Sequence, residues 1–449
     1  MTRERTAARR SAGKLAIAVF LLGSLLIGLS ACRGFFGQGP IALMVIDPHG
    51  DTELPVDVEF NISGSIDPDG VIASFTLDFG DGAQTSSVSV SPRIWHTYVT
   101  ADTYTAKLTV TDTDGRIGMD NEIVVIGPAM ITFAANRGSS FDIYRMVADG
   151  TNQVAVLHTA DGELFPDLVR GTRDRIAYAA EGDTSWNIWT MTVNGTNAAP
   201  LTTQTPSNQI QPSWSYNAST LAYASSANTA QTPSSDMWEI WTIAADGSGA
   251  GPLTSQSPSW AIAPSCSPAV DGDILFVSDS DAAGDSAIWV CDADGDNARI
   301  LKDGPGRDGD ASPTSPELDA LTASLKLPTN AGISRPVWSP DGMKIAYAAD
   351  HDGQIDIFVM DADESDVGGD EQTLEEYIHE ELGVDPDPDI TTDDDEFCPY
   401  WLDDGSDEGA IVYAKADGPD IQLYKVTLAT GEIAPLTEVG DNISPASKR

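Results

Sequence analysis

Two patterns of apolar and polar positions divide the chain. Over residues 42–126, apolar and polar side chains alternate in short runs such as VDVEFNISGS, VIASFTLDF and TYTAKLTVTD. Clusters of Asp, Gly and Pro separate these runs. Alternation with a period of two predicts β-strands that bury one face. Short strands with frequent turns therefore predict a two-sheet, Ig-like β-sandwich over residues 42–127.

A second pattern begins near residue 130, where one unit recurs. A strand that contains a proline precedes an apolar strand such as RIAYAA, then a third strand such as NIWTMT, a turn, and a short segment that often ends in Leu-Thr. The prolines are Pro166, Pro212, Pro264, Pro336, Pro399 and Pro445, with spacings of 46, 52, 72, 63 and 46 residues. Four short strands at this period predict a six-bladed β-propeller over residues 128–449.

The repeat is offset around the ring. The last proline strand has no partner strands after it, and the strand MITFAA at 130–135 has no proline strand before it. Joining the two ends completes one blade and removes the exposed sheet edges of an open ring. The pattern therefore predicts that N-terminal and C-terminal strands share a blade.

The first 31 residues predict an export signal instead of a domain. A basic start precedes the apolar run LAIAVFLLGSLLIGL, which is too short for a spanning helix. The run ends in LSAC, which resembles the bacterial lipoprotein signal box, and this resemblance implies lipid attachment at Cys32. Residues 32–41 then form a tether. Arg33 follows the cysteine where an Asp would signal inner-membrane retention. We therefore expect a cell-envelope protein, held in the outer membrane of a Gram-negative cell, on its periplasmic face or at the cell surface.

Both predicted domains resemble known families. SIDPDG (65–70), DFGDG (78–82), HTY (96–98) and the segment from Tyr104 to LTVTD resemble the PKD domain, with Leu77 where Trp is usual. The family implies an extracellular spacer or adhesive module. RPVWSPDGMKIAYAADHDGQIDIFVMDAD (335–363) resembles the WD40-like repeat of TolB-type propellers, and the resemblance spans about 130–449. TolB has an α/β domain where this chain has the PKD-like module, so its role is not carried over.

Two insertions interrupt the propeller repeat, near 303–334 and 364–390. In the first, Ser315-Pro316 predicts a helix start. In the second, Thr373 and Glu376 form a capping box, and Gly383 would end the helix. Both helices are expected to cover blade surface, with a partner-binding rim as the alternative.

Charge excludes one class of partner. The formal net charge is −45, and removal of residues 1–31 would take away five basic residues and one acidic residue, which leaves −49. Such an imbalance excludes nucleic acid, which needs basic patches. It fits solubility, cation binding or a saline habitat.

Residues with catalytic chemistry are scarce. His379-Glu380-Glu381 lacks the second His of a zinc protease helix, and no GxSxG motif occurs. Cys266, Cys291 and Cys398 form no CxxC, and their odd number leaves at least one thiol unpaired. The recurring tryptophans predict core packing between blades instead of carbohydrate platforms. We therefore predict no catalytic residues, no zinc site and no cofactor.

The most acidic turn is the one candidate for a metal. In WVCDADGDN (289–297), Asp292, Asp294 and Asp296 alternate with small residues as in a calcium loop. Sibling segments such as VADGTN and TVNGTN occupy the same repeat position with fewer acids, so a turn between third and fourth strands is expected. Calcium at these three aspartates is a weaker alternative.

The function predicted from these observations is non-catalytic. The chain is expected to be a membrane-anchored lipoprotein that binds a protein or glycan partner through its propeller and uses the PKD-like domain as a spacer. One alternative is a hydrolase or glycan lyase with a site in the central channel, which acids and His facing the channel would favour. A further alternative is a calcium-stabilised surface adhesin.

Overall fold

The computed structural model describes most of the chain. The described residues are 39–47, 56–87, 93–99, 102–126, 129–169, 175–183, 185–203, 207–226, 238–254, 260–269, 272–279, 286–303, 335–351, 354–362, 372–385, 396–402, 409–417 and 420–446. The chain divides into two compact units, Met1–Gly127 and Pro128–Arg449. Within the described part, no helix has the length and apolar character needed to cross a membrane. The predicted export signal, Cys32 and Arg33 lie outside the described residues.

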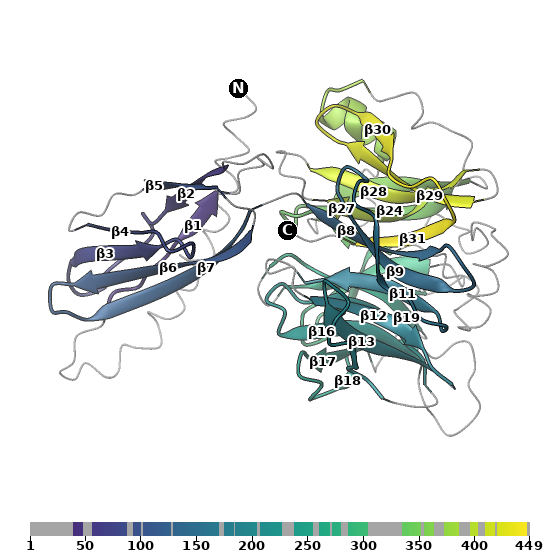
Figure 1. Cartoon of the computed structure of the whole chain (residues 1–449), viewed down its shortest axis with the longest axis horizontal. Helices are drawn as coiled ribbons and strands as arrows, with labels where there is room; N and C mark the ends of the chain where they lie inside the picture. Colours follow the sequence, from purple (N-terminus) through teal and green to yellow (C-terminus); the bar gives the residue numbers. More distant parts are fainter. Residues whose placement is uncertain are drawn as a thin grey trace. The chain divides into compact units, whose positions relative to one another are not determined.

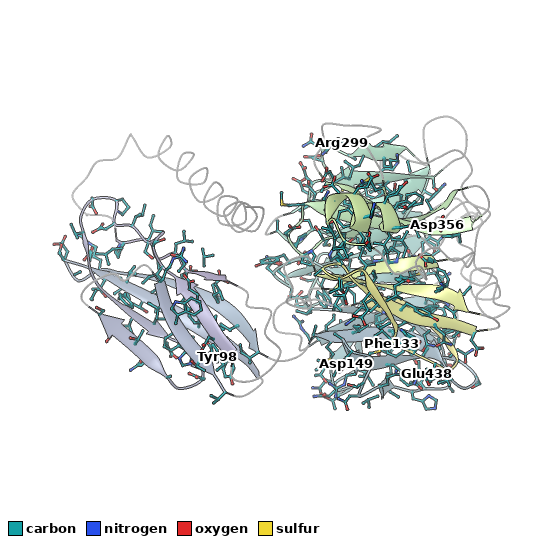
Figure 2. The ribbon with its side chains drawn as sticks, turned by 90° about the horizontal axis from the view of Figure 1, so that it is seen from above. Tyr98, Phe133, Asp149, Arg299, Asp356 and Glu438 are labelled. Carbon is teal, nitrogen blue, oxygen red and sulfur yellow. The ribbon has the colours of Figure 1, made fainter. Side chains whose placement is uncertain are left out.

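Unit 1 is a β-sandwich of two antiparallel sheets (Figure 1). One sheet has the order β1(Val45–Asp47), β2(Val56–Asn61), β5(Arg93–Tyr98). The other has the order β4(Gln84–Ser87), β3(Ile72–Asp78), β6(Asp102–Asp112), β7(Ile117–Ile126). The core contains Leu77, fully buried at the position where the family usually has Trp. Tyr98 is also buried, and its hydroxyl donates to the carbonyl of Phe79 at 2.8 Å (Figure 2).

The aspartates of the DFGDG turn serve the turn itself. Asp78 and Asp81 accept the backbone N–H groups of Gly80 and Ala83, each at 2.9 Å. Asp81 also lies 2.7 Å from Nε2 of His96. The prediction that these acids form turns is confirmed at this site.

Unit 2 consists of six four-stranded antiparallel sheets (Figure 1). We number these blades from the one that contains the first strand of the unit, and give each from its inner strand outward. Blade 1 is β31(Asp441–Ala446), β8(Met130–Asn136), β9(Phe141–Val147), β10(Val154–Leu157). Blade 2 is β11(Glu163–Leu168), β12(Arg175–Glu181), β13(Trp186–Thr192), β14(Ala199–Pro200). Blade 3 is β15(Gln209–Trp214), β16(Thr220–Ser226), β17(Trp238–Ala244), β18(Gly251–Pro252).

The other three blades repeat this order. Blade 4 is β19(Ala261–Cys266), β20(Ile274–Asp279), β21(Ser286–Cys291), β22(Arg299–Asp303). Blade 5 is β23(Val337–Trp338), β24(Lys344–His351), β25(Gln354–Asp361), β26(Gln372–Thr373). Blade 6 is β27(Glu396–Leu402), β28(Ala410–Asp417), β29(Asp420–Thr427), β30(Glu432–Pro435).

The six blades form a closed ring. Each inner strand contacts the inner strand of the next blade, in the order β31, β11, β15, β19, β23, β27 and back to β31. The last strand, β31, pairs with β8 through partners such as Asn442 and Ala135. The predicted six-bladed propeller, with N-terminal and C-terminal strands in one blade, is confirmed.

A bulge precedes the proline of most inner strands. Phe165, Gln211, Ala263 and Cys398 each stand directly before the proline and have φ of 52°, 53°, 54° and 50°. The strand register shifts at the same places. Proline has no N–H for the ladder, and an extra, unpaired residue accommodates it inside a sheet. The repeated proline therefore marks a repeated bend in the wall of the central channel.

The second insertion contains the predicted helix start. Thr373 caps α3(Leu374–Glu376): its hydroxyl accepts the N–H of Glu376 at 3.2 Å, and the Glu376 carboxylate accepts the N–H of Thr373 at 3.0 Å. The predicted capping box is confirmed. The chain continues as a π-helix, η1(Tyr377–Glu381), and Gly383 follows with φ of 67°. The helix predicted at Ser315-Pro316 lies outside the described residues.

The recurring tryptophans pack as predicted. Trp214 and Trp401 are buried, with 1% and 5% exposed. The third-strand and blade 5 tryptophans lie against buried clusters; they are Trp189, Trp241, Trp289 and Trp338. Their role in these positions is to fill space between sheets.

Candidate functional site

The chain path gives the propeller two distinct faces. In each blade the inner strand runs away from one face, the second strand returns to it, and the fourth strand also ends there before the next inner strand begins. We call this the start face. The turns between third and fourth strands lie on the opposite face. In propellers, binding and catalytic residues gather in the loops of one face or in the channel between the blades.

Three ionisable side chains meet on the start face between blades 1 and 2. Asp142 lies near the beginning of β9, His158 follows the end of β10, and Glu163 begins β11. Nδ1 of His158 lies 2.5 Å from Oδ2 of Asp142. The carboxylate accepts this hydrogen bond, so Nε2 of the ring is left for another partner. The His158 side chain is 70% exposed, whereas that of Asp142 is only 2% exposed.

Glu163 is the most perturbed acid of this cluster. Burial raises the pKa of Glu163 to about 7, and the negative charges of Asp142 and Asp161 act in the same direction. The hydroxyl of Thr159, which donates to Glu163, opposes the rise, as does His158. Oε2 of Glu163 and Oδ1 of Asp142 are buried and have no hydrogen-bond partner among the described residues. The cluster can therefore hold or release a proton near neutral pH.

Comparison between blades shows how blade 1 differs. In three blades, the hydroxyl of the Thr in the Leu-Thr segment accepts a backbone N–H of the third strand of the same blade, at 2.9 to 3.0 Å. These residues are Thr202, Thr254 and Thr437. His158 occupies this position in blade 1 and contacts the Asp142 side chain instead. The position that Glu163 occupies in blade 2 is occupied by Gln209 in blade 3. Glu396 fills the same position in blade 6 and is also buried, so blades 2 and 6 share an acid there, whereas His in place of the recurring Thr is found in blade 1.

Hydrogen bonds connect the inner strands of successive blades. Oδ2 of Asp167 accepts the N–H of Trp214 at 2.7 Å, and Oγ of Ser213 accepts the N–H of Cys266 at 3.1 Å. The side chain of Gln211 accepts the N–H of Ala263 at 2.9 Å. Each bond joins one blade to the next, so the centre of the ring is tied together by polar contacts as well as by apolar packing.

Arg335 crosses the centre of the ring. It stands directly before the proline of blade 5, and its Nη2 donates to the carbonyl of Pro212 in blade 3 at 3.0 Å. Nη2 also lies 3.7 Å from Oδ1 of Asp167 in blade 2. Blades 2 and 5 are opposite each other in a ring of six, so this side chain spans the channel. Its guanidinium is 14% exposed and the carboxylate is fully buried.

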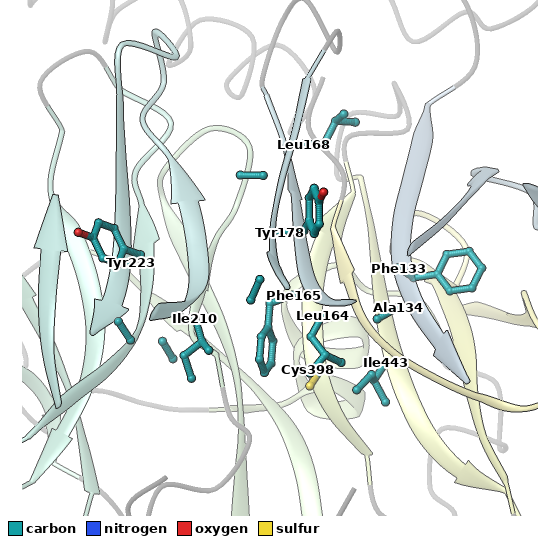
Figure 3. Close-up of a cluster of buried hydrophobic side chains, with 14 of the residues drawn as sticks. Phe133, Ala134, Leu164, Phe165, Leu168, Tyr178, Ile210, Tyr223, Cys398 and Ile443 are labelled. Atoms are coloured by element: carbon teal, nitrogen blue, oxygen red, sulfur yellow. The ribbon is translucent and has the colours of Figure 1, made fainter. Parts of the chain in front are cut away.

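Apolar side chains also line the channel wall. Phe165 and Cys398, both at proline bulges, are 7% and 6% exposed. Figure 3 shows Phe165 among Leu164, Ile210 and Cys398, which belong to one buried cluster with it. An enzyme site in the channel would bring acids and His together there, and the structure meets this expectation only in part. Acids are present, but His158 lies at the rim, outside the wall formed by the inner strands.

The acidic turn on the opposite face is organised by its own backbone. The N–H of Asp292 donates to the carbonyl of Asp296 at 3.0 Å, and the N–H of Gly295 donates to the carbonyl of Asp292 at 2.9 Å. The same two bonds form around Gly150, Gly195 and Gly247, where acids are fewer. Oδ1 of Asp294 accepts the N–H of Asp296 at 3.3 Å. Among the described residues no three His, Cys, Asp or Glu are placed to hold a metal, and calcium at Asp292, Asp294 and Asp296 stays a prediction.

The cysteines are thiols. Cys266, Cys291 and Cys398 form no disulfide. Burial raises the pKa of the Cys291 thiol to about 12, with nearby aspartates acting in the same direction. A thiol with so high a pKa is a packing residue instead of a nucleophile.

The sequence pattern did not identify Asp142, His158, Glu163 or Arg335 as site residues. A signal for His158 was present, because it replaces Thr in the recurring Leu-Thr segment. A signal for Arg335 was also present, because it is the one cation directly before a repeat proline. The partners of both lie in other strands or other blades, and strand alternation does not specify such contacts.

Comparison with known proteins supports both folds. A model of the PKD domain family matches residues 40–126. TolB from Acinetobacter baumannii is similar in structure, with a TM-score of 0.50 and 17% identity over 78% of this chain and 80% of that chain. Hydrazine synthase from Kuenenia stuttgartiensis also has a TM-score of 0.50, with 13% identity over 71% of this chain and 46% of that chain.

At these identities the structural likeness concerns the fold alone. The family match covers the sandwich, and the propeller accounts for most of the described chain. The chain therefore carries a PKD domain at residues 40–126, followed by a six-bladed β-propeller similar in fold to TolB.

Proposed function

We propose that this protein is a lipid-anchored lipoprotein of the cell envelope that binds a protein or glycan partner through its propeller. The observation that supports this most directly is the filled centre of the ring. Arg335 spans the channel, and inner-strand residues such as Phe165 and Gln209 are buried. A channel occupied in this way favours recognition on a face over chemistry inside the ring.

The start face is the proposed binding surface. The long connections 304–334 and 382–395 join fourth strands to the next inner strands, so both leave and return on this face. Within the second connection and the start of the strand after it, the run DPDPDITTDDDE (385–396) has seven acidic residues and no Lys or Arg. A partner with a positively charged region would be attracted to such a surface.

Unit 1 has the geometry of a spacer. The tether residues Gly39 and Pro40 lie beside the beginning of β7, at Ile117 and Gly118. Strand β7 then runs to Ile126, directly before the propeller begins. At about 3.3 Å per residue, the two attachment points are separated by about 30 Å. The tether and the chain that leads to the propeller thus attach at opposite ends of β7.

Capture from the envelope tests the binding proposal. The lipidated protein is immobilised and exposed to its own detergent-solubilised envelope, alongside two variants. His158→Ala alters the start face, and Asp294→Asn alters the opposite face without removing a buried side chain. We expect a partner that the start-face variant retains poorly, that the opposite-face variant retains fully, and that high salt releases. Equal retention by both variants would contradict the assignment of the face.

The anchor and the location have their own test. Mass spectrometry of the mature N-terminal peptide is expected to show an acylated Cys32, and fractionation is expected to place the protein with the outer membrane. An unmodified N-terminal peptide that begins at another residue would overturn the anchor, whatever the capture experiment shows.

Catalysis is the second candidate, and the Asp142–His158–Glu163 cluster favours it. A buried carboxylate that orients an exposed imidazole, beside a carboxyl group with a raised pKa, is an arrangement used for general acid–base catalysis. Such an enzyme would lose activity in His158→Ala, and its pH profile would change in Glu163→Gln. A panel of envelope glycans and peptides, each tested with wild type and both variants, checks this candidate.

A further inference from the structure

Exposed large apolar side chains are concentrated in the smaller unit. Among the described residues, the PKD domain has seven of the ten and the propeller has three. Five of the seven surround the tether: they are Ile41, Ile66, Val71, Ile117 and Met119. We call these five residues the tether-end patch. Scattered apolar side chains need no explanation, but a contiguous group on a small domain marks an interaction site.

Backbone contacts bring the first members of the patch together. Ile41 and Ile66 exchange backbone hydrogen bonds of 2.7 and 3.0 Å. Gly118, between Ile117 and Met119, lies so close to Pro40 that a Cβ there would be 2.1 Å from the Pro40 carbonyl oxygen. The tether therefore lies against the beginning of β7 on the face of Gly118, and Ile117 and Met119, which alternate with Gly118, project from the other face at the same end of the strand.

Val71 joins the patch through the turn before β7. Its carbonyl accepts the N–H of Thr113 at 3.2 Å, and Thr111 pairs with Ile117 across β6 and β7. Val71, Ile117 and Met119 are 67%, 58% and 66% exposed. Side chains exposed to this degree gain from any apolar environment that covers them.

The sequence outside the described residues limits what can cover the patch. Gly39 follows the proposed lipid anchor Cys32 by seven residues, which span at most about 25 Å when fully extended. The patch is therefore always held within about one sandwich length of the bilayer that holds the anchor. Its exposed apolar side chains would meet the lipid surface more often than any soluble partner.

We propose that the tether-end patch rests on the surface of the bilayer in which Cys32 is anchored. This rests on the proposed lipid anchor. Contact there would orient the sandwich upright and direct the far end of β7, at Ile126, away from the lipid. The patch suits a shallow contact with the membrane interface, because it consists of two exposed strand residues, a turn valine and two half-exposed isoleucines.

Charges at this end select the lipid. Asp67 and Asp69 lie in the turn before Val71; Asp69 is exposed and Asp67 is half-buried. Arg116 lies 3.0 Å from Asp114 and 3.2 Å from Asp112, so its charge is balanced within the turn. The rim of the patch is therefore acidic. We infer a zwitterionic lipid surface, because an anionic one would repel these carboxylates.

The test separates the patch from the natural anchor. The mature chain, with Cys266→Ser to remove the half-buried thiol, is coupled through Cys32 to vesicles of phosphatidylcholine that contain a maleimide lipid. Hydrogen exchange is compared with that of the uncoupled chain. We expect amides of 113–119 to exchange about tenfold more slowly on the vesicle, as for groups removed from water. Amides of 124–126, at the far end of β7, serve as the internal control and are expected to be unchanged.

Variants and lipid composition complete the design. Replacement of both Ile117 and Met119 by Ser should abolish the slowing, whereas Val154→Ser and Val439→Ser in the propeller should preserve it. Addition of phosphatidylglycerol should reduce it. Unchanged exchange of 113–119 on phosphatidylcholine vesicles would overturn the proposal. Slowing that appears without vesicles and grows with protein concentration would also overturn it, and would identify contact between copies of the chain. Chemical coupling keeps this result independent of whether cells acylate Cys32.

Discussion

The substitution Glu163→Gln tests whether Glu163 in the start-face cluster is protonated and uncharged in the folded protein. In the folded protein the pKa of Glu163 is raised to about 7 from its ordinary value of 4.5, first because of burial and then because of Asp142 and Asp161. The unfolded chain keeps the ordinary value. Folding therefore costs nothing extra below pH 4.5, where the group is protonated in both states. Between pH 4.5 and about 7 the unfolded chain ionises while the folded protein keeps the proton, so stability is lost over this interval and levels off above it.

The size of the effect follows from the two pKa values. Each pH unit between them is worth about 1.4 kcal/mol, which gives an upper limit of about 3 kcal/mol. Solvent at the rim, where His158 is largely exposed, screens the charge and reduces the effect to about 1–2 kcal/mol. Gln has the same shape and does not titrate, and Gln209 already fills the equivalent position in blade 3. Glu163→Gln is therefore expected to stabilise the propeller above pH 7 relative to wild type.

The assay is urea unfolding of both proteins at pH 5, 7 and 9, because charges elsewhere cancel in the difference. The difference in unfolding free energy should grow from pH 5 to pH 9 in favour of Glu163→Gln. Asp149 supplies a control of opposite sign when the series is extended to about pH 3: hydrogen bonds from Thr151 lower the pKa of Asp149, so its contribution is constant from pH 5 to 9 and is lost as pH falls below the ordinary value of 3.8. A difference for Glu163→Gln that is the same at all three pH values would refute the reasoning.

Three other outcomes can be checked by unfolding and labelling. Gly195→Ala should lower the free energy of unfolding by about 3 kcal/mol, because φ is +79° and the new Cβ would lie 2.0 Å from a backbone oxygen of blade 1. Gly249→Ala, with φ of +69° and open space around it, should lower it by only about 1 kcal/mol. Equal losses would show that close packing is irrelevant. A double-mutant cycle of Arg335→Met with Asp167→Asn should show a coupling of about 1–3 kcal/mol in urea unfolding, and additive losses would deny a contact across the ring. Cys291 should react with a thiol reagent at pH 8 only after the protein is denatured, and rapid labelling of the native protein would contradict its burial.

Local signals were enough to predict the strands and their order from sequence. The proline of each inner strand and the apolar strand after it recur with a fixed relation, and a repeat of this kind can bury its faces only against copies of itself. The capping box at Thr373 depends on two residues three positions apart, so it too could be predicted. The same holds for turns around glycine, where positive φ is required.

The candidate site depends on contacts that no local pattern specifies. His158 and Asp142 are separated by a hairpin, and Arg335 contacts residues of blades 2 and 3 that precede it by more than a hundred positions. Whether the acid at Glu163 is ionised depends on burial, which arises only when the ring is assembled. Similarly, the tether-end patch consists of isoleucines, a valine and a methionine that in sequence resemble any strand residues. Their exposure follows from which face of the sandwich each one occupies.

Closure of the ring by β31 has a consequence for folding during synthesis. Strand β8 is made early, but its inner neighbour β31 follows much later in the chain: Thr132 and the carbonyl of Ala446, which form a hydrogen bond, are 314 positions apart. The first blade must therefore wait for β31, and this pairing has a very high contact order, which slows folding. Until then two sheet edges stay open, and such edges are sites of misassembly. A loss of only the final strand should thus impair the yield of folded protein far more than its short length suggests.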